Sequence, residues 1–113
     1  MAKKKSAKGG RPPKLKALPS CIRERLQEGR VRFRAHALEQ MRTRKIREPE
    51  VRFVLENGSE EKRKTEFDET HRKWKYAVRG WTLDREKELR VVVNVDESTD
   101  MIIVTAIDLG LGE

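Results

Sequence analysis

A histidine, an amide and a guanidinium recur every fourth residue along a predicted basic helix over residues 34–46: His36, Gln40 and Arg44. At about 100° per residue, these three side chains form one row on the helix surface. The row lies beside an apolar stripe formed by Ala37, Leu38 and Met41. Imidazole, amide and guanidinium groups one turn apart can hold or protonate an anion, which indicates phosphate chemistry on a polyanion. The other interpretation is a solvated basic face.

The sequence does not indicate metal chemistry. The single cysteine, Cys21, can form neither an internal disulfide nor half of a CxxC zinc motif, and the two histidines complete no zinc pattern. His71 lies in a polar stretch over residues 68–72 that is typical of an exposed loop. We therefore expect no metal and no cofactor, and we expect His36 to be the group that titrates near neutral pH inside a motif.

The composition limits the chain to one small domain. Its 113 residues suffice for three or four strands against two or three helices. Charged residues make up 41% and hydrophobic residues 35%, and the hydrophobic residues concentrate in the C-terminal half, which favours a folded domain with a disordered end. No apolar run approaches about 18 residues and no secretory signal follows the N-terminal lysines, so we expect a cytoplasmic protein without a membrane span.

The positive charge is concentrated at the N-terminus. Residues 1–16 contain seven lysines and arginines and no acidic residue, whereas residues 17–113 carry 20 basic and 19 acidic residues. We predict a basic flexible tail over residues 1–19, because it has few apolar side chains to bury. Its centre, GGRPPK over residues 9–14, resembles an AT-hook, although an unspecific tether to RNA or DNA is the favoured interpretation. The tail residues expected to contact nucleic acid are Lys3, Lys4, Lys5, Arg11 and Lys14.

Helical signals occupy the first half of the domain and strand signals the second. The predicted helices cover residues 20–28, 34–46 and 47–57. Residues 30–33 alternate charged and apolar side chains, as a short strand or an extended lead. The predicted strands cover residues 60–67, at a sheet edge, then 73–82, 88–96 and 101–107. This order predicts an α+β domain over residues 20–113, with N-terminal helices packed on one face of a three- or four-stranded antiparallel sheet. The predicted core comprises Leu38, Met41, Val51, Val54, Leu55, Tyr76, Val91, Val93 and Ile103.

Basic side chains alternate with apolar ones along the predicted strand 73–82. Lys73, Lys75 and Arg79 project from one side of it, and Arg90 on the next strand can extend this basic strip. The strip can bind a phosphate backbone, or it can be solvated or form salt bridges with Glu60, Glu61, Glu86 and Glu88. Trp81, at the strand end, is the candidate for stacking on a base, whereas Trp74 is assigned to the core. We predict that the His36 row and the basic strip define one groove.

The residues of the first helix row resemble a family signature. His36, Ala37, Met41, Arg44 and Ile46 fit the pattern HAxxRMxxRxI of a family of small bacterial domains of unknown function. Gln40 stands where that pattern has arginine. The order of elements over residues 31–108 is similar to BrnT toxins and, more distantly, to RelE-like messenger-RNA interferases. The resemblance implies a RelE-like fold, with helices on a small antiparallel sheet.

The same resemblance implies a toxin of a toxin–antitoxin system that cleaves RNA without a metal. His36 would be the acid or base, Arg44 a phosphate clamp and Gln40 an orienting group. The implied partners are RNA, including ribosome-associated messenger RNA, and an antitoxin protein. A noncatalytic nucleic-acid-binding protein and a protein-interaction module remain as alternatives.

Overall fold

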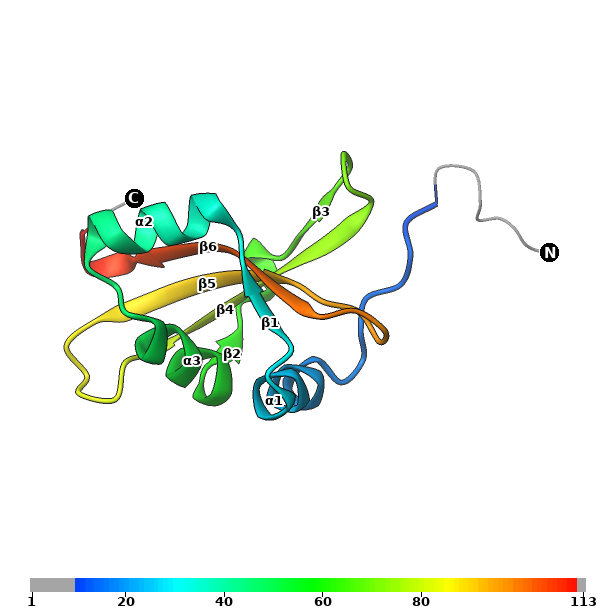
Figure 1. Ribbon diagram of the computed structural model, residues 1–113. Coiled ribbons are helices and arrows are strands. Elements are labelled where there is room, and N and C mark those ends of the chain that lie inside the picture. Colours follow the sequence, from blue (N-terminus) through cyan, green and yellow to red (C-terminus); the bar gives the residue numbers. More distant parts are fainter. Residues whose placement is uncertain (1–9, 112–113) are drawn as a thin grey trace.

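Three α-helices and a mixed sheet form the α+β fold of residues 10–111, the part of the chain that this computed structural model describes (Figure 1). The helices are α1 (Leu18–Glu28), α2 (Ala35–Arg44) and α3 (Glu48–Asn57). The strands are β1 (Val31–Phe33), β2 (Ser59–Glu60), β3 (Glu66–Asp68), β4 (Lys73–Trp81), β5 (Glu88–Asn94) and β6 (Met101–Asp108). Two 3₁₀ turns, η1 (Lys62–Lys64) and η2 (Leu109–Leu111), complete the list.

The sheet has the strand order β1-β6-β5-β4-β2, and β3 also pairs with β4. The predicted antiparallel order of β4, β5 and β6 is confirmed. The sheet is nevertheless mixed, because β1 pairs with β6 in parallel, with Val31 opposite Met101. This differs from the purely antiparallel sheet that the sequence predicted. A three-residue strand has little sequence signal, and its pairing partner lies about seventy residues away.

One edge strand is interrupted where the sequence predicted a polar edge strand over residues 60–67. β2 and β3 pair with successive parts of β4, and η1 lies between them opposite Ala77. There, the Glu61 N–H donates to the Ala77 carbonyl at 2.7 Å, and the Thr65 hydroxyl accepts the Ala77 N–H at 3.1 Å. The interruption therefore leaves the hydrogen bonds of β4 satisfied, while the side chains of η1 stay exposed.

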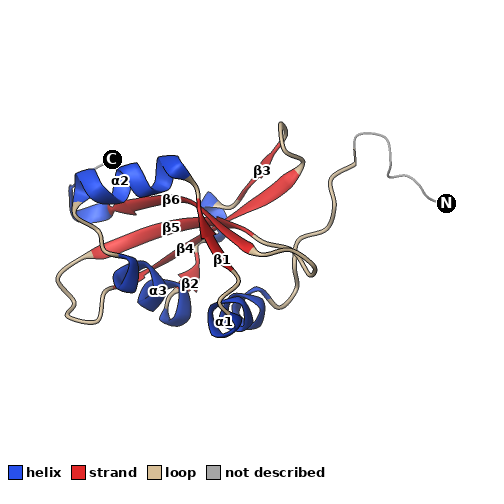
Figure 2. Ribbon diagram, in the orientation of Figure 1, coloured by secondary structure: helices blue, strands red, loops and turns tan. Residues whose placement is uncertain are grey.

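The helices share one face of the sheet, and the core lies between (Figure 2). Alternate residues of β5, Leu89, Val91 and Val93, are fully buried against them. A register shift at Val92/Val93 lets β6 present both Ile103 and Ala106 to the core. Every predicted core residue is buried except Leu38, which is 43% exposed. That prediction was wrong because α2 lies along β6 at the sheet edge, so only Ala37 and Met41 of its stripe face inward.

Within residues 10–111, no α-helix covers the opposite face of the sheet, which we call the outer face. Arg90 and Val92 of β5 point to it, as do Lys75, Ala77 and Arg79 of β4, because they alternate with core residues in register. None of the helices within residues 10–111 is long and apolar enough to cross a bilayer.

The expected flexible tail is partly ordered in the structure. Residues 10–16, which we call the arm segment, lie against β4: the Leu15 N–H donates to the Tyr76 hydroxyl at 2.9 Å, and the Trp74 indole N–H donates to the Pro12 carbonyl at 2.7 Å. α1 then begins at Leu18, two residues before the predicted Ser20 cap. Leu15 of the arm segment also packs against the core. Residues 1–9, which include Lys3, Lys4 and Lys5, lie outside the described residues.

Candidate nucleic-acid interface

The polar row of α2 closes an open sheet edge. β6 runs five residues beyond its partner β1, and no other strand among residues 10–111 pairs with that part of its edge. The Gln40 amide oxygen accepts from the Ala106 N–H at 3.4 Å, and the Arg44 guanidinium donates to the Ala106 carbonyl at 3.3 Å. Two of the three side chains predicted to handle phosphate therefore satisfy backbone groups, which protects the β6 edge from pairing with another chain.

His36 lies one turn earlier on α2 and is exposed. Within residues 10–111, its side chain has no hydrogen-bond or ion-pair partner. The predicted single groove is also absent there, because the row is at the β6 edge whereas Arg79 and Arg90 point from the outer face of β4 and β5. The structure thus does not join the His36 row and the basic strip into one site.

Carboxylates neutralise one end of the basic strip. The Arg79 guanidinium contacts Glu88 at 2.9 Å and Glu61 at 3.2 Å, and the Arg90 guanidinium contacts Glu61 at 2.7 Å. The Arg90 hydrogen bond is the main cause that holds the pKa of Glu61 below its ordinary value, against an opposing effect of burial and with help from Arg79. Glu88 and Glu61 in turn raise the pKa of Arg79. The salt-bridge interpretation is confirmed for Arg79 and Arg90.

The other end of the strip carries uncompensated cations. Lys62, Arg63 and Lys64 of η1 are all exposed, and none of them makes an ion pair with any residue in the described range 10–111. A hollow of about 230 Å³ on the outer face is lined by Lys64, Glu66, Lys75, Arg90, Val92, Val104 and Thr105. We call this hollow the outer-face groove. Lys75 makes one ion pair within residues 10–111, and it is long: its ammonium lies 3.9 Å from the carboxylate of the exposed Glu66. The groove is consequently a positively charged, open surface that suits an anionic backbone.

The sequence reasoning missed the three cations of η1. Their signal is the run Lys62-Arg63-Lys64, which lies in a stretch interpreted only as a charged edge strand. η1 falls between β2 and β3, opposite the middle of β4, and this places Lys64 on the groove. Strand periodicity cannot indicate this placement, since the run is not part of the ladder.

The two tryptophans lie at opposite ends of β4. Trp81 is 43% exposed, and the Arg85 guanidinium lies 5.6 Å from its ring centroid. Trp74 packs against the core and meets Phe67 edge to face at 5.2 Å between centroids. Lys73 is exposed opposite Asp68 in register. Trp81 therefore remains available for stacking, but at the neutralised end of the strip.

His71 has a local structural role. Its Nδ1 lies 2.9 Å from a carboxylate oxygen of Asp68, and the same carboxylate accepts the Thr70 and His71 N–H groups in the β3–β4 turn. These bonds, led by the His71 side chain, keep the pKa of Asp68 below its ordinary value. No cluster of three or more metal-ligating side chains occurs between residues 10 and 111.

A family model described as a domain of unknown function, DUF4258, matches residues 33–108, well over half of the chain. The chain belongs to the DUF4258 family. This agrees with the predicted membership of a family of small domains of unknown function. No curated protein and no solved structure matches the chain.

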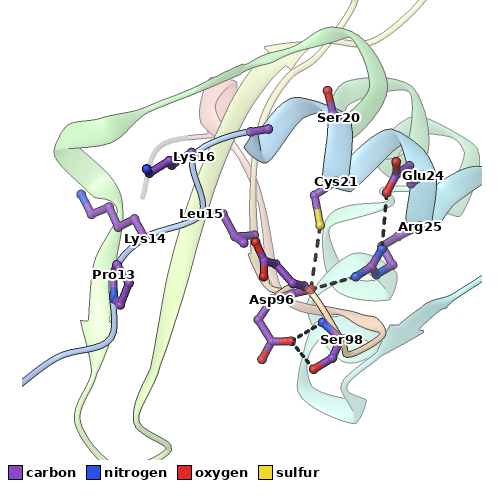
Figure 3. Close-up of a pocket in the computed structure, with 12 residues that line it drawn as sticks. Pro13, Lys14, Leu15, Lys16, Ser20, Cys21, Glu24, Arg25, Asp96 and Ser98 are labelled. Carbon is purple, nitrogen blue, oxygen red and sulfur yellow. Dashed lines mark hydrogen bonds and ion pairs between the residues drawn. The ribbon is translucent and has the colours of Figure 1, made fainter. Parts of the chain in front are cut away.

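The DUF4258 domain contains the whole outer-face groove, from Lys64 to Thr105, together with α2 and α3. The arm segment and α1 precede it. They enclose a hollow of about 730 Å³ with the β5–β6 turn (Figure 3). Buried Arg25 anchors that turn by donating to the Thr99 and Asp96 carbonyls at 2.7 and 2.8 Å. Burial raises the pKa of the nearby Cys21 thiol, with a smaller opposing effect of Arg25. The arm segment and α1 thus lie outside the residues matched by the DUF4258 model. The β5–β6 turn of the DUF4258 domain holds α1 in place through Arg25.

Proposed function

We propose that this DUF4258 protein binds an RNA backbone in its outer-face groove. The observation that carries the proposal is the convergence of Lys64 from the exposed η1 run with Lys75 and Arg90 around one hollow, on the sheet face opposite the α-helices. Arg79, by contrast, is matched by Glu61 and Glu88. Lys62, Arg63 and Lys64 are left without a carboxylate partner within residues 10–111, although the chain has 19 acidic residues, and such cations are where a polyanion releases counterions on binding.

The groove also has the polarity that RNA recognition requires. It is lined by the aliphatic Val92 and Val104 together with the charged Lys64, Lys75 and Glu66. Cations bind phosphates, while apolar side chains accommodate the faces of sugars and bases. The binding surface therefore lies on the side of the sheet opposite the helices.

Cleavage at this groove is the second candidate function, and the pairing of Glu66 with Lys75 favours it. In a metal-independent reaction, the RNA 2′-oxygen attacks the adjacent phosphorus and the bond from phosphorus to the 5′-oxygen breaks. Glu66 would accept the proton of the 2′-hydroxyl, and the Lys75 ammonium would give a proton to the leaving 5′-oxygen. Lys64 and Arg90 would stabilise the additional negative charge on the phosphate.

The similarity to BrnT and RelE-like toxins supports the endoribonuclease form of the proposal. In this form of the proposal, the catalytic groups lie on the outer face. They are not His36 and Arg44, which do not line the groove. As a toxin, the protein would act on messenger RNA, with or without the ribosome, and an antitoxin protein would be its partner. RNA binding without cleavage requires neither the ribosome nor an antitoxin.

The binding proposal is tested by fluorescence anisotropy with labelled single-stranded RNA over a series of salt concentrations. Lys64→Ala combined with Lys75→Ala should weaken binding, and should flatten the plot of log K against log salt by about 1.4, because each lost phosphate contact contributes about 0.7 for a single strand. The matched control removes two exposed cations that lie elsewhere, by Arg23→Gln with Arg42→Gln. Equal losses in both double variants would show unspecific attraction and contradict the groove.

The cleavage proposal is tested on RNA and on translating ribosomes. Glu66→Gln should reduce the cleavage rate by roughly 10²–10⁴-fold, while RNA affinity stays the same or rises. His36→Ala is the matched control and should cleave like the parent. If purified parent protein binds RNA but cuts nothing under either condition, the noncatalytic function holds and the nuclease form is wrong.

A further inference from the structure

The arm segment is attached to the β3–β4 hairpin by its backbone. Its carbonyl groups accept hydrogen bonds from two side chains of the hairpin: Pro12 from the Trp74 indole at 2.7 Å and Gly10 from the Arg72 guanidinium at 2.8 Å. Leu15 points from the arm toward the β5–β6 turn, whereas Lys14 and Lys16 extend away from it (Figure 3). The docked arm therefore has a fixed inner side and a cationic outer side.

Two aromatic rings hold the cations of this region. The Arg11 guanidinium lies 5.1 Å from the Phe67 centroid and 5.9 Å from that of Trp74, and the Lys14 ammonium lies 4.8 Å from the Trp74 centroid. The Arg72 guanidinium lies 5.0 Å from the Phe67 ring. A ring face restrains a cation without neutralising it, and a stacked guanidinium keeps the N–H groups of its edge available for other acceptors.

Arg72 has an unusual backbone for its role. Its φ of 56° lies in the left-handed region that a side chain with a Cβ rarely adopts. The same residue donates to the arm, contacts the Phe67 ring and pairs with Glu69 at 3.2 Å. Uncommon backbone geometry of this kind persists where surrounding contacts impose it, and these three contacts fix Arg72 between the arm segment and the hairpin.

We propose that the docked arm segment and the β3–β4 hairpin form a second nucleic-acid-binding surface, preformed in the free protein. Arg11, Lys14 and Arg72 contact phosphates while they remain on the two rings. The inference rests on the proposed function, because it takes the same class of ligand. Glu69 is the carboxylate that pairs with Arg11 and Arg72, in exposed contacts that a phosphate can replace. Lys14 has no carboxylate partner within residues 10–111.

The two surfaces occupy opposite faces of one hairpin. Phe67 and Trp74 are opposite each other on the inner face, and Glu66 and Lys75 are opposite each other on the outer face. An RNA strand that passes around the hairpin can therefore contact both surfaces. Prior docking of the arm removes the entropy loss of ordering it on binding, so affinity depends on the rings as well as on the charges.

The first test follows the Trp74 indole N–H by NMR during titration with a single-stranded uridine oligoribonucleotide. The expected result is a shift of this signal with retained slow exchange with solvent, because phosphate arrives while the bond to Pro12 persists. A signal that stays unchanged at saturating RNA overturns the inference. Exchange that rises to the rate of a free indole also overturns it, since the arm has then left the rings.

The second test changes the ring and leaves every charge in place. Trp74→Leu should weaken RNA binding about threefold to tenfold, as expected for the loss of one or two cation–π contacts, whereas the matched Phe53→Leu on α3 should change it less than about twofold. Equal affinity in the Trp74→Leu and parent proteins overturns the inference. The groove variant Lys64→Ala with Lys75→Ala separates the two proposals. A Trp74 signal that still shifts in this variant supports the second surface on its own, and an unchanged signal in parent protein that binds RNA overturns only the second surface.

Discussion

The two ends of β4 carry similar basic residues in opposite electrostatic states. At the Trp81 end, Arg79 and its neighbour Arg90 share the carboxylate of Glu61, and Arg79 also pairs with Glu88. At the Lys75 end, the three cations of η1 have no carboxylate partner within the described residues 10–111. One end of the basic strip therefore forms structural salt bridges, and the other end is the candidate binding site. The difference comes from acidic residues on other segments, which strand periodicity does not place.

The polar side chains of α2 and the cations of the outer face also differ in whether they have partners within the protein. Gln40 and Arg44 resemble a phosphate-handling row, but both bond to the Ala106 backbone at the open β6 edge. Polar groups that serve the backbone are unavailable to a ligand without a loss of stability. A site is therefore to be sought where cations lack such partners.

The largest expected effect comes from removing the uncompensated end. Lys62→Ala, Arg63→Ala and Lys64→Ala together should lower RNA affinity by on the order of 100-fold at about 0.1 M salt, because three phosphate contacts are lost. Arg79→Gln is the matched change at the compensated end and should alter affinity less than about twofold. Comparable losses at the two ends, measured by anisotropy, would remove the distinction between them.

Glu61→Gln should make the compensated end resemble the other. Arg79 and Arg90 lose their shared carboxylate, so urea unfolding should show a stability loss of about 1.5–3 kcal/mol, the usual contribution of a hydrogen bond to a charged group. RNA affinity should rise, because a negative charge beside the two arginines is removed. The conservative Glu61→Asp variant serves as control. A Glu61→Gln protein with parental stability and affinity would contradict the assigned role of these ion pairs.

Acid should weaken the compensated end selectively. The pKa of Glu61 is lower in the folded protein than its ordinary value of 4.5, chiefly because of the Arg90 hydrogen bond. Its contribution to stability is therefore complete above that ordinary value and is lost as the pH falls toward the folded pKa. The stability difference between parent and Glu61→Gln should shrink below about pH 4.5. A difference that is constant from neutral to acidic pH would mean that Glu61 does not titrate with this linkage.

The smallest effects are expected on α2. Gln40→Ala should reduce the free energy of unfolding by about 1 kcal/mol, because the Ala106 N–H loses its partner. His36→Ala should stay within about 0.5 kcal/mol of the parent, since His36 is an exposed position. Neither change should reduce RNA affinity. A strong loss of RNA binding in His36→Ala, measured by anisotropy, would mean that the RNA interface includes α2.

Local patterns were sufficient to predict most of the fold. Alternation in β4 and β5 correctly assigned Val91 to the core and Arg90 to the other face, and Gly29 ends α1 in the expected left-handed conformation. The parallel pairing of β1 and the docking of the arm were not predictable in this way, because both depend on partners far away in the chain. The prediction that Leu38 is buried was wrong, because a periodic apolar stripe does not show how many of its residues a helix at a sheet edge can bury.

The candidate site was only partly predictable. Lys75 and Arg90 follow from strand alternation, and the structure places both on the groove. Lys64 was missed because its 3₁₀ turn has no periodic signal of its own. The pairing of Arg79 with Glu88 was one of two interpretations that the sequence left open, and only the register of β4 and β5 decides between them.

Cross-linking localises the RNA on the domain most directly. The parent protein is irradiated with single-stranded RNA that contains 4-thiouridine, and the modified peptides are identified by mass spectrometry. The expected cross-links lie in residues 62–66 and 73–75 and in the groove part of β5 around Val92. Cross-links confined to α2, around His36 and Arg44, or to the Arg79 end of β4 would contradict the assignment of the outer-face groove.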